Sequence, residues 1–514
     1  MEITSISGRD VSLIYSPTET DAVVGTAFAV RELPDRTRGV VVQVIENSTL
    51  DLEGFLVGQV QTLLEKAAAG TRTIYDGEEG GGAVQQLKVA ACKIRARLDG
   101  DRWMDFNGWV PGRGAEITPV GSEELLAHVV RLPQVPMRQF ASYGQSAVEF
   151  DGARLGQCTL LVGNKSRGKS HILKQITLGL LEHRVPVVIW DMNYEYRLPG
   201  FQVMRLGRNY KISLSESGPS VIETLVGMIA PLLPGSSSET TLSTRLPQLF
   251  RKRRQECAEE RVPYTMDLPW LRKQHWSEHD MVQAAVVNRF RQLGELDIFA
   301  DEVEEGQPSQ DTIAAAYEVA CEEGRPIVFE MLPLQPSVRQ ALFRATMQTL
   351  ERICERERAD GTERTPQILM DEAHFYASES VLTNAVTRSR HVGWGMCLAT
   401  NSPDLIPNVV LRLLDNLIVL PTSHEDDVRL ISKAAASFCD KVTVESLIRS
   451  LPDRHAIIMG DLTNRWPLVV EVGPLPDHIP PTGVTRSPWT RLIGGGKPKN
   501  GEWDGSNGPR STIP

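Results

Sequence analysis

The sequence lacks the features of several protein classes. Its seven cysteines are odd in number and scattered, with no CxxC pair and no zinc-type Cys/His spacing, which argues against a disulfide framework and a structural zinc and favours a reducing compartment. No apolar run approaches the roughly 18 residues that a membrane-spanning helix needs, and the N-terminus has charges where a signal peptide would have its apolar segment. We therefore expect a soluble cytoplasmic protein that makes no use of a membrane.

An excess of basic charge is also missing. The chain has 55 Lys and Arg against 65 Asp and Glu, a formal net charge of −10, so no overall positive field attracts nucleic acid and any contact with DNA must be local. The cluster Arg251-Lys252-Arg253-Arg254 is one candidate, but Glu256, Glu259 and Glu260 follow it. A solvated helix with i,i+4 ion pairs is the favoured interpretation.

The length and the pattern of the chain predict several domains. At about 150 residues per domain, 514 residues predict about three. In residues 1–134, Val23 to Val30 and Gly39 to Ile45 are rich in β-branched residues, with the turn-forming Leu33-Pro34-Asp35 between them, which predicts a small β domain. Within it, residues 53–69 and 83–98 look more helical.

From about residue 135 the pattern changes to that of an α/β fold. Short apolar runs alternate with helical segments, as in a parallel sheet with crossover helices whose strands are covered on both faces. The runs lie at residues 158–162, 185–190, 326–331, 367–370, 396–400 and 417–420. Residues 221–323 are mostly helical in composition, which predicts an α-helical insertion between the two parts of the core, 135–220 and 324–480. Residues 481–514 form a tail too poor in apolar residues to fold alone.

One phosphate-binding motif is complete. Gly163-Asn164-Lys165-Ser166-Arg167-Gly168-Lys169-Ser170 matches GxxxxGK[ST], follows an apolar strand and precedes a helix that opens at His171. In such a loop the backbone N–H groups surround a phosphate, and the helix N-terminus adds the positive end of its dipole. Lys169 would reach the β- and γ-phosphates, and Ser170 would hold Mg²⁺. The motif therefore predicts that residues 163–171 bind ATP and Mg²⁺.

A distant pair of acids suits the same site. The apolar run at 367–370 ends in Asp371 and Glu372. Asp371 would join Ser170 in the Mg²⁺ shell, and Glu372 would polarise the attacking water. Without the phosphate-binding loop, the pair would also suit a helix start, where acids are favoured. His374 has no second ligand at metal-type spacing, so we expect packing or coupling to the nucleotide state rather than metal binding.

Three polar residues near the strand at 396–400 are further candidates. Asn401 is placed to sense the γ-phosphate, but a turn before Ser402-Pro403 explains it almost equally well. Arg388 and Arg390 are either solvated surface residues or fingers that project into a neighbouring subunit's nucleotide. Arg390 is the first choice because it is nearer the strand and because an irregular segment would point the two side chains differently.

With these residues assembled, the chain resembles the HerA family of hexameric DNA-translocating ATPases, related to the FtsK-type pumps, over most of residues 1–480. Asp191-Met192-Asn193-Tyr194-Glu195-Tyr196 is similar to the family's D-x-x-G-E-Y, with Tyr194 in place of Gly. The segment Arg388 to Gly393 looks like its arginine-rich stretch, and Val23 to Thr26 and Val110 to Gly112 look like pieces of its N-terminal barrel. Asn401 stands where the family usually has Gln, and Glu330 where it usually has Asp.

The resemblance implies a RecA-like core with an N-terminal β-barrel-like domain, a homo-hexamer with ATP sites between subunits, and double-stranded DNA in the central channel. One functional hypothesis is a translocase or helicase that works with a partner nuclease in DNA end processing or anti-phage defence. Another is an ATP-regulated ring that assembles and switches an effector, a nuclease or a sirtuin-like NADase, docked on the N-terminal domain. A monomeric P-loop kinase or GTPase fits poorly, because no guanine-reading Asn-Lys-x-Asp is evident. The partner, the direction of translocation, the preferred DNA end and the pore-lining residues cannot be deduced from the sequence.

Overall fold

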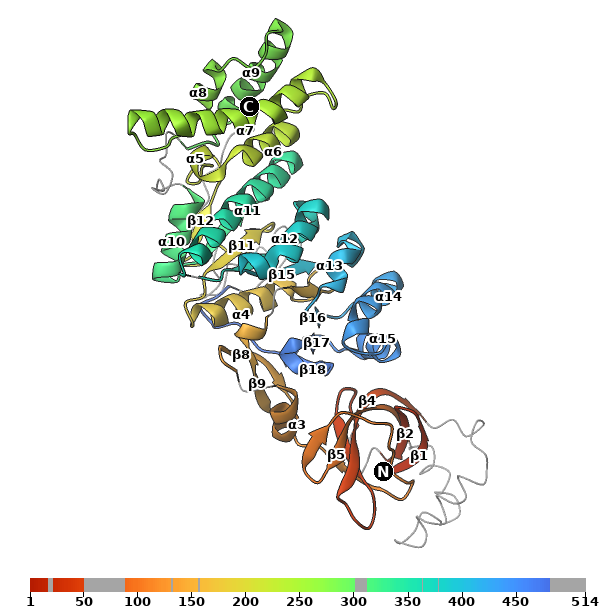
Figure 1. Cartoon of the computed structure of the whole chain (residues 1–514). Coiled ribbons are helices and arrows are strands. Elements are labelled where there is room, and N and C mark those ends of the chain that lie inside the picture. The colour runs from red at the N-terminus through yellow and green to blue at the C-terminus, as the bar shows by residue number, and fades with distance from the viewer. Residues whose placement is uncertain are drawn as a thin grey trace, which may run out of the picture.

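The computed structural model describes residues 1–16, 22–49, 88–130, 133–155, 158–300, 312–362, 364–377 and 379–480. The helix expected at 53–69 and the tail at 481–514 lie outside these ranges. In Figure 1 the N-terminal sheet lies at one end of the molecule, a large sheet with its helices forms the middle, and helices α7, α8 and α9 lie at the opposite end.

The N-terminal part is an antiparallel sheet, as the β-branched pattern predicted. Its strand order is β1-β2-β5-β4-β3-β7, with β6 paired to β5. The strands are β1 (Glu2–Ser7), β2 (Asp10–Tyr15), β3 (Ala27–Arg31), β4 (Arg38–Thr49), β5 (Lys88–Asp99), β6 (Arg102–Met104) and β7 (Glu116–Pro119). One core of this sheet contains alternate residues of β4, namely Val40, Val42 and Val44.

The helix expected at 83–98 is wrong for residues 88–98, which form β5. Small and apolar residues alternate with basic ones along this segment: Ala90, Cys92, Ile94, Ala96 and Leu98 are all buried, whereas the residues between them are partly exposed. A period of two places one set of side chains on one face of a strand, and it cannot form an apolar stripe on a helix. The many alanines and long basic side chains favoured a helix only on local propensity.

The large sheet has the strand order β12-β13-β11-β14-β15-β10-β16-β17-β18-β8-β9 in the described residues. Strands from β12 to β16 are parallel, and the rest of the sheet is antiparallel. The parallel strands are β10 (Thr159–Val162), β11 (Val187–Asp191), β12 (Gln202–Met204), β13 (Ile327–Glu330), β14 (Gln367–Met370), β15 (Gly395–Thr400) and β16 (Asn416–Val419). The antiparallel strands are β8 (Pro136–Tyr143), β9 (Ser146–Asp151), β17 (His455–Gly460) and β18 (Leu468–Val472). All six predicted runs are therefore strands of one sheet.

The two faces of the large sheet bury different cores. In β10, Leu160 and Val162 belong to one core and Leu161 to the other. Helix α4 (Lys169–Leu181) covers the face of Leu161, whereas α11 (Pro336–Ala359) and α12 (Glu379–Val392) cover the opposite face. This two-sided burial explains why the parallel strands are continuously apolar, and it is the mixed α/β architecture that the sequence predicted.

The described part of residues 214–323 contains helices and no named strand. They are α5 (Leu214–Ser217), α6 (Pro219–Ile229), α7 (Ser237–Glu260), α8 (Leu268–Lys273), α9 (Asp280–Glu295) and α10 (Ile313–Glu323). The remaining helices are α3 (Ser122–Val129), α13 (Asn408–Arg412), α14 (Glu425–Ala434) and α15 (Lys441–Ser450), with short 3-10 turns that include η2 (Ala373–Phe375) and η3 (Pro403–Leu405). Among the helices of the described ranges, none combines the length and apolar character needed to span a bilayer.

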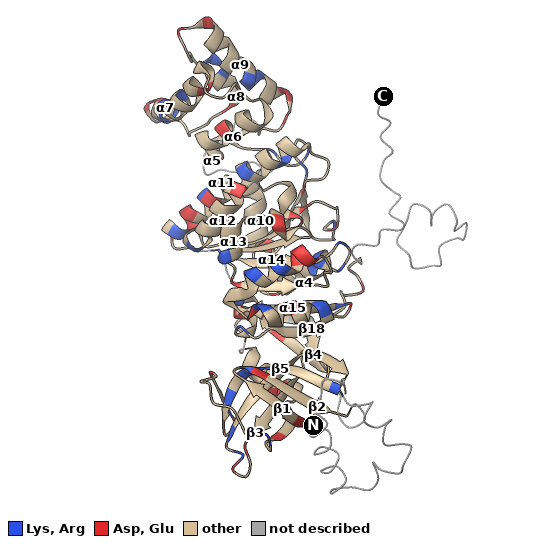
Figure 2. Ribbon diagram, turned by 90° about the vertical axis from the view of Figure 1, so that its right-hand side faces the viewer, with Lys and Arg blue, Asp and Glu red and all other residues tan. Residues whose placement is uncertain are grey.

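The basic cluster at 251–254 lies on α7 and is compensated by nearby acids. Lys252 pairs with Glu256 at 3.5 Å, and Arg253 pairs with the same carboxylate at 3.8 Å. Figure 2 shows acidic and basic residues mixed along these outer helices. The expected i,i+4 pairing is thus confirmed for Lys252 and Glu256.

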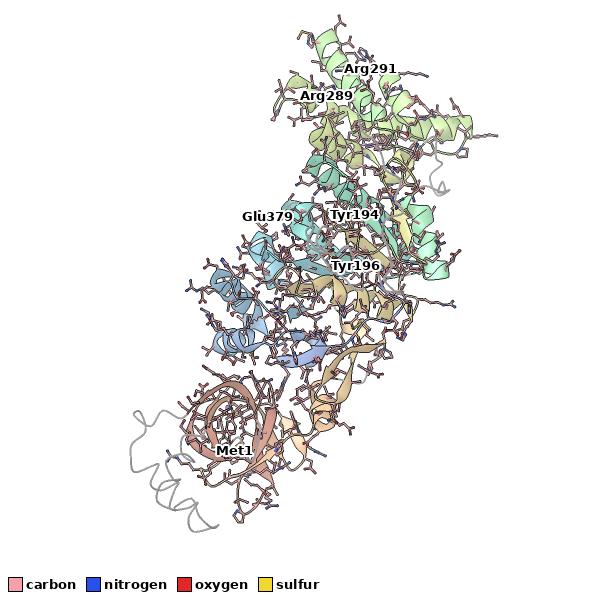
Figure 3. All side chains as sticks on the ribbon, turned by 180° about the vertical axis from the view of Figure 1, so that it is seen from behind. Met1, Tyr194, Tyr196, Arg289, Arg291 and Glu379 are labelled. Atoms are coloured by element: carbon pink, nitrogen blue, oxygen red, sulfur yellow. The ribbon has the colours of Figure 1, made fainter. Side chains whose placement is uncertain are left out.

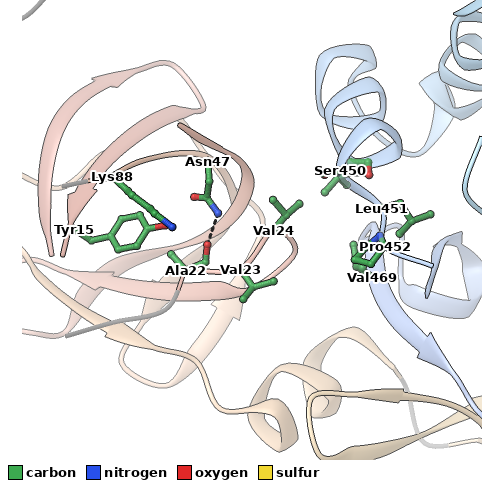
Figure 4. Close-up of a pocket in the computed structure, with 11 residues that line it drawn as sticks. Tyr15, Ala22, Val23, Val24, Asn47, Lys88, Ser450, Leu451, Pro452 and Val469 are labelled. Carbon is green, nitrogen blue, oxygen red and sulfur yellow. Dashed lines mark hydrogen bonds between the residues drawn. The ribbon is translucent and has the colours of Figure 1, made fainter. Parts of the chain in front are cut away.

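The N-terminal sheet is tied to the core by buried polar contacts. Gln43 donates from Nε2 to the carbonyl oxygen of Pro467 at 2.8 Å, and Ser446 donates to that of Ile45 at 3.1 Å. Beside these contacts a cavity of about 250 Å³ lies between Tyr15, Asn47 and Lys88 on one side and Leu451 and Val469 on the other (Figure 4).

Candidate active site

The predicted phosphate-binding loop lies between β10 and α4, where its pattern placed it. A Cβ atom on Gly163 would lie 2.6 Å from Cβ of Leu420, so this position requires glycine for close packing against β16 and the residue after it. Gly168 has φ +101°, a conformation that L-residues rarely adopt, and it directly precedes the first turn of α4. The loop therefore ends at a helix N-terminus, whose free N–H groups suit an anion.

Lys169 is the charged centre of this loop. Its side chain is only 5% exposed, and Nζ donates to the carbonyl oxygens of Gly163 at 3.1 Å and Asn164 at 3.2 Å. The ammonium also lies 3.9 Å from Oε1 of Glu372. Burial lowers the pKa of Lys169, and the carboxylates of Glu372 and Asp371 oppose that shift.

Asp371 faces the loop from the end of β14. In the sheet, β14 is separated from β10 by β15 alone. Oδ2 of Asp371 lies 3.5 Å from the Ser170 hydroxyl and accepts a hydrogen bond from Nδ2 of Asn193 at 3.3 Å. Burial, followed by the charges of Glu372, Glu195 and Asp191, raises the pKa of Asp371 to about 8. The site therefore brings together carboxyl groups whose ionisation is disfavoured by their burial and proximity, and a bound cation would favour it.

The loop after β11 contributes some of these carboxyl groups. Oδ1 of Asp191 accepts from the backbone N–H of Asn193 at 2.9 Å, and Oδ2 accepts from that of Tyr196 at 3.1 Å, so the turn is built around the Asp191 carboxylate. Burial raises the pKa of Glu195, and a hydrogen bond with the Ser170 side chain opposes that shift. Neither Asn193 nor Glu195 was among the site residues that the sequence motifs predicted.

These oxygens fit Mg²⁺ only together with a nucleotide. The Ser170 hydroxyl and the Asp371 carboxylate are the hard oxygen donors that Mg²⁺ prefers. Within the described ranges, no three His, Cys, Asp or Glu side chains are grouped so that they would hold a metal by themselves. Mg²⁺ usually completes its shell with water and phosphate oxygens, so the donors present are suitable for an ion that arrives with the nucleotide.

Glu372 is buried and held in an unusual backbone conformation. Its φ is +50°, in the left-handed region that costs an L-residue about 1–2 kcal/mol. Oε2 accepts from the backbone N–H of Asn401 at 3.4 Å and lies 3.6 Å from Nδ1 of His374. The structure thus brings Glu372 beside Lys169, as the sequence pattern requires of a residue that acts at the γ-phosphate.

Asn401 reaches the site through its backbone. Its side-chain Oδ1 accepts from the Ser402 hydroxyl at 3.0 Å, a local contact typical of a turn, whereas its N–H contacts Glu372. The turn interpretation therefore has a counterpart here, and sensing of the γ-phosphate by Asn401 stays a prediction. The turn is present, and the residue lies next to the acid pair.

Arg388 and Arg390 lie on helix α12, so the expectation of an irregular segment is wrong. Two residues correspond to about 200° around a helix, which still points the two side chains in different directions. Arg388 forms ion pairs with Glu351 and, at 2.7 Å, with Glu355. Arg390 pairs with Asp415 at 3.4 Å and remains 70% exposed.

The other loop residues contact neighbouring segments or solvent. Asn164 accepts from the Thr422 hydroxyl at 3.0 Å, Arg167 pairs with Asp453, and Nε2 of His171 lies 2.8 Å from the carbonyl oxygen of Gly473. Lys165 and Ser166 are exposed.

Two of the three departures from the HerA pattern, Tyr194 and Glu330, have local explanations. Tyr194 has φ +60°, the region that glycine adopts readily, and the Arg197 guanidinium lies 4.1 Å from its ring centre. The buried Glu330 carboxylate binds both Arg197 and Arg205, the latter at 3.0 Å. Figure 3 places Tyr194 and Tyr196 in the middle of the molecule, far from Arg289 and Arg291 on α9.

Comparisons with known proteins yield distant structural likenesses. No protein-family model and no curated protein matches the sequence. VirB4 of Thermoanaerobacter pseudethanolicus aligns at 14% identity and a TM-score of 0.49, over 67% of this chain and 98% of VirB4. The plasmid coupling protein TrwB, bound to a non-hydrolysable GTP analogue, aligns at 13% identity and a TM-score of 0.45, over 69% and 92% of the two chains.

The genome packaging NTPase B204 of Sulfolobus turreted icosahedral virus 2, in complex with ATP-γS, aligns at 13% identity and a TM-score of 0.30, over 62% of this chain and 97% of B204. Identities and TM-scores this low do not identify a function, which has to come from the site itself. The strand, loop, helix and acid pair are arranged as a P-loop NTPase requires.

Proposed function

We propose that this chain is an ATPase whose active site is formed by the loop at 163–171 and the acid pair Asp371 and Glu372. One observation carries the proposal. Lys169 and Ser170, at the start of α4, face Glu372 and Asp371, which come from a strand two positions away in the sheet. A phosphate cradle, a buried cation and two carboxylates are the groups that phosphoryl transfer to water needs.

Each residue has a distinct role in this proposal. Backbone N–H groups of the loop and of the first turn of α4 bind the phosphates, and Lys169 exchanges its carbonyl partners for β- and γ-phosphate oxygens. Ser170 and Asp371 would hold Mg²⁺, which neutralises phosphate charge when bound. Glu372 orients the attacking water by accepting a hydrogen bond from it, and takes up the proton that this water loses while the γ-phosphoryl group transfers.

The proposed assembly is a HerA-type homo-hexamer that moves double-stranded DNA through its channel. The resemblance in sequence supports it, together with the position of Arg390 on α12, where its side chain is 70% exposed. A net charge of −10 is compatible with DNA binding, because a few basic residues per subunit are multiplied around a ring. A nuclease or sirtuin-like effector docked on the N-terminal domain belongs to the same proposal and rests on the resemblance alone.

Two assays test this function. Phosphate release by the purified protein is measured with Mg²⁺ and ATP, with and without linear duplex DNA, and displacement of a triplex-forming strand from the duplex reports translocation. We expect ATP hydrolysis that duplex DNA stimulates, and displacement that requires ATP. Hydrolysis without displacement would favour the ATP-regulated scaffold, and an absence of hydrolysis in both conditions would contradict the ATPase proposal.

A further inference from the structure

His374 lies between the acid pair and the end of β15. Its side chain is only 8% exposed, and Nδ1 is 3.1 Å from the Thr400 hydroxyl oxygen and 3.6 Å from Oε2 of Glu372. Thr400 is the last residue of β15 and directly precedes Asn401, whose backbone N–H contacts the same Glu372 carboxylate. One imidazole nitrogen therefore faces both Glu372 and the strand end that adjoins the nucleotide site.

The surrounding hydrogen bonds determine which nitrogen carries the proton. Burial lowers the pKa of His374, so the imidazole is neutral near pH 7 and has one N–H. The Thr400 hydroxyl accepts from the backbone N–H of Ser402 at 3.0 Å and donates to the carbonyl oxygen of Ser402 at 3.3 Å. With its proton already engaged, the hydroxyl needs a second donor, and an N–H at Nδ1 supplies it.

The opposite tautomer satisfies fewer groups. A proton on Nε2 would leave a lone pair on Nδ1 directed at the Glu372 carboxylate, and Thr400 would have to abandon either Ser402 or the imidazole. An N–H at Nδ1 places the positive end of its dipole toward both oxygens. The geometry therefore assigns the proton to Nδ1.

Glu372 needs such a donor once nucleotide binds. In the structure its carboxylate lies near Lys169, Asn401 and His374. If Lys169 moves its ammonium to the phosphates, Glu372 loses its cationic neighbour while its left-handed backbone keeps the side chain close to His374. The Nδ1–H of His374, whose nitrogen lies 3.6 Å from Oε2, is then within a small side-chain rotation of a direct hydrogen bond to this carboxylate.

We propose that His374 is a positioning residue that shares its Nδ1–H between Thr400 and Glu372, and so couples the end of β15 to the orientation of the catalytic carboxylate. The role of Glu372 in hydrolysis is that of the proposed function, on which this inference rests. His374 touches no substrate in this scheme. It acts on the reaction only by holding Glu372 where the attacking water needs it.

Substitutions at position 374 distinguish the roles of the two imidazole nitrogens. The amide nitrogen of asparagine can take the place of Nδ1, whereas that of glutamine takes the place of Nε2. We expect His374→Ala and His374→Gln to lower kcat for ATP by about 10- to 100-fold, as loss of an outer-shell partner commonly does. KM should change little, because the lost contact serves the transition state rather than binding. His374→Asn should recover most of the lost turnover.

A double-mutant cycle provides the decisive control. If His374 works through Glu372, adding His374→Ala to a Glu372→Gln protein should not lower turnover further. Equal kcat values for the Asn and Gln variants, or additive losses in the cycle, would overturn the proposal. A raised KM with unchanged kcat would overturn it as well.

A second cycle does not depend on hydrolysis. The unfolding midpoints of wild type, His374→Ala, Glu372→Ala and the double variant are compared in the absence of nucleotide. A control cycle replaces Glu372→Ala with Glu46→Ala, a substitution at an exposed site in the N-terminal sheet. If the effects of the His374 and Glu372 substitutions on the unfolding midpoint are not additive, whereas those of the His374 and Glu46 substitutions are, the proposed contact is supported. Additive effects in both cycles would overturn it. If wild type itself fails to hydrolyse ATP, the proposed function fails, and this cycle still decides whether His374 and Glu372 are coupled.

Discussion

At the scale of single residues, Lys169 is held by groups that a nucleotide can replace. Its ammonium is bound to two loop carbonyl oxygens and lies near Glu372, so the buried charge is compensated by groups of the protein. Phosphate oxygens offer the same ammonium stronger charge-assisted hydrogen bonds. The exchange would release Glu372 as Lys169 moves, which would link phosphate binding to the freeing of the carboxylate that we propose to orient water.

Removal of either member of this pair should have a different effect. Lys169→Ala should abolish tight ATP binding because it removes a phosphate contact, whereas Glu372→Gln should retain binding and lose turnover by about 10²- to 10⁴-fold. Nucleotide affinity and phosphate release are measured for both proteins, with Lys433→Ala, an exposed lysine on α14, as a control. Wild-type turnover in the Glu372→Gln protein would remove this residue from the catalytic role.

Lys169, Ser170, Asp371 and Glu372 could be predicted because each follows a buried parallel strand, and the carboxyl ends of such strands meet at one edge of the sheet. A loop between a strand and a helix fixes Lys169 and Ser170, and the carboxyl end of a parallel strand fixes Asp371 and Glu372. The partners Asn193 and Thr400 were not predicted, because their contacts depend on which strands become neighbours and on the rotation of each side chain. For Asn193, the sequence did contain one signal: its loop, residues 191–196, resembles the D-x-x-G-E-Y pattern of the HerA family.

At the scale of elements, the sequence predicted strands best where both faces are buried. The six continuous apolar runs are strands, whereas β8, β9 and β18, which alternate or carry polar residues, were not identified. Strand β17 is nearly all buried, and its run from Ala456 to Met459 was a signal that went unused. Strand β5 was assigned to a helix because its alanines and basic residues outweighed its period of two.

Helix α5 makes stability depend on pH through Glu216. Burial raises the pKa of Glu216 to about 7, although the nearby Arg356 and Arg352 oppose the shift. The folded chain therefore binds this proton more tightly than the unfolded chain does, so the stabilisation is complete below the ordinary carboxyl range and is lost as the pH rises to about 7.

Glu216→Gln should remove this dependence. Between about pH 4.5 and pH 7 we expect the wild-type free energy of unfolding to fall relative to that of the variant, by at most about 1.4 kcal/mol per pH unit. Denaturant unfolding at several pH values measures this difference. Glu239→Gln on α7 is the control, because the Glu239 carboxylate accepts a hydrogen bond from the backbone N–H of Gly235 at an exposed position. Parallel pH profiles for wild type and Glu216→Gln would show that the carboxyl group does not titrate in this window.

At the scale of the whole molecule, the proposed ring predicts the number of subunits in solution. A site that takes an arginine from a neighbour is complete only in a closed ring of head-to-tail contacts. We therefore expect a homo-hexamer by light scattering or native mass spectrometry, and we expect ATP and Mg²⁺ to favour it. A stable monomer with full ATPase activity would contradict both the ring and the transfer of an arginine between subunits.

Arg390 is the better candidate for that arginine. Arg388 is engaged by two carboxylates of its own chain, Glu351 and Glu355, whereas Arg390 is 70% exposed and pairs with Asp415 at 3.4 Å. The Arg390 side of this ion pair is open to solvent although Asp415 is largely buried, so a neighbouring triphosphate could reach the guanidinium and compete with Asp415 for it. A finger that acts across an interface is worth about 10³- to 10⁵-fold in turnover in other NTPases, whereas loss of a solvated arginine changes turnover little.

Mixing two inactive proteins tests whether Arg390 acts across the interface. Arg390→Ala subunits retain Glu372, and Glu372→Gln subunits retain Arg390, so some interfaces of a mixed ring would pair an intact Glu372 with an intact Arg390 from the neighbour. We expect partial hydrolysis to return in proportion to those interfaces, and Arg388→Ala mixed in the same way serves as the comparison. If mixed rings form without recovering activity, or if Arg390→Ala alone stays fully active, Arg390 has no such role and Arg388 becomes the candidate.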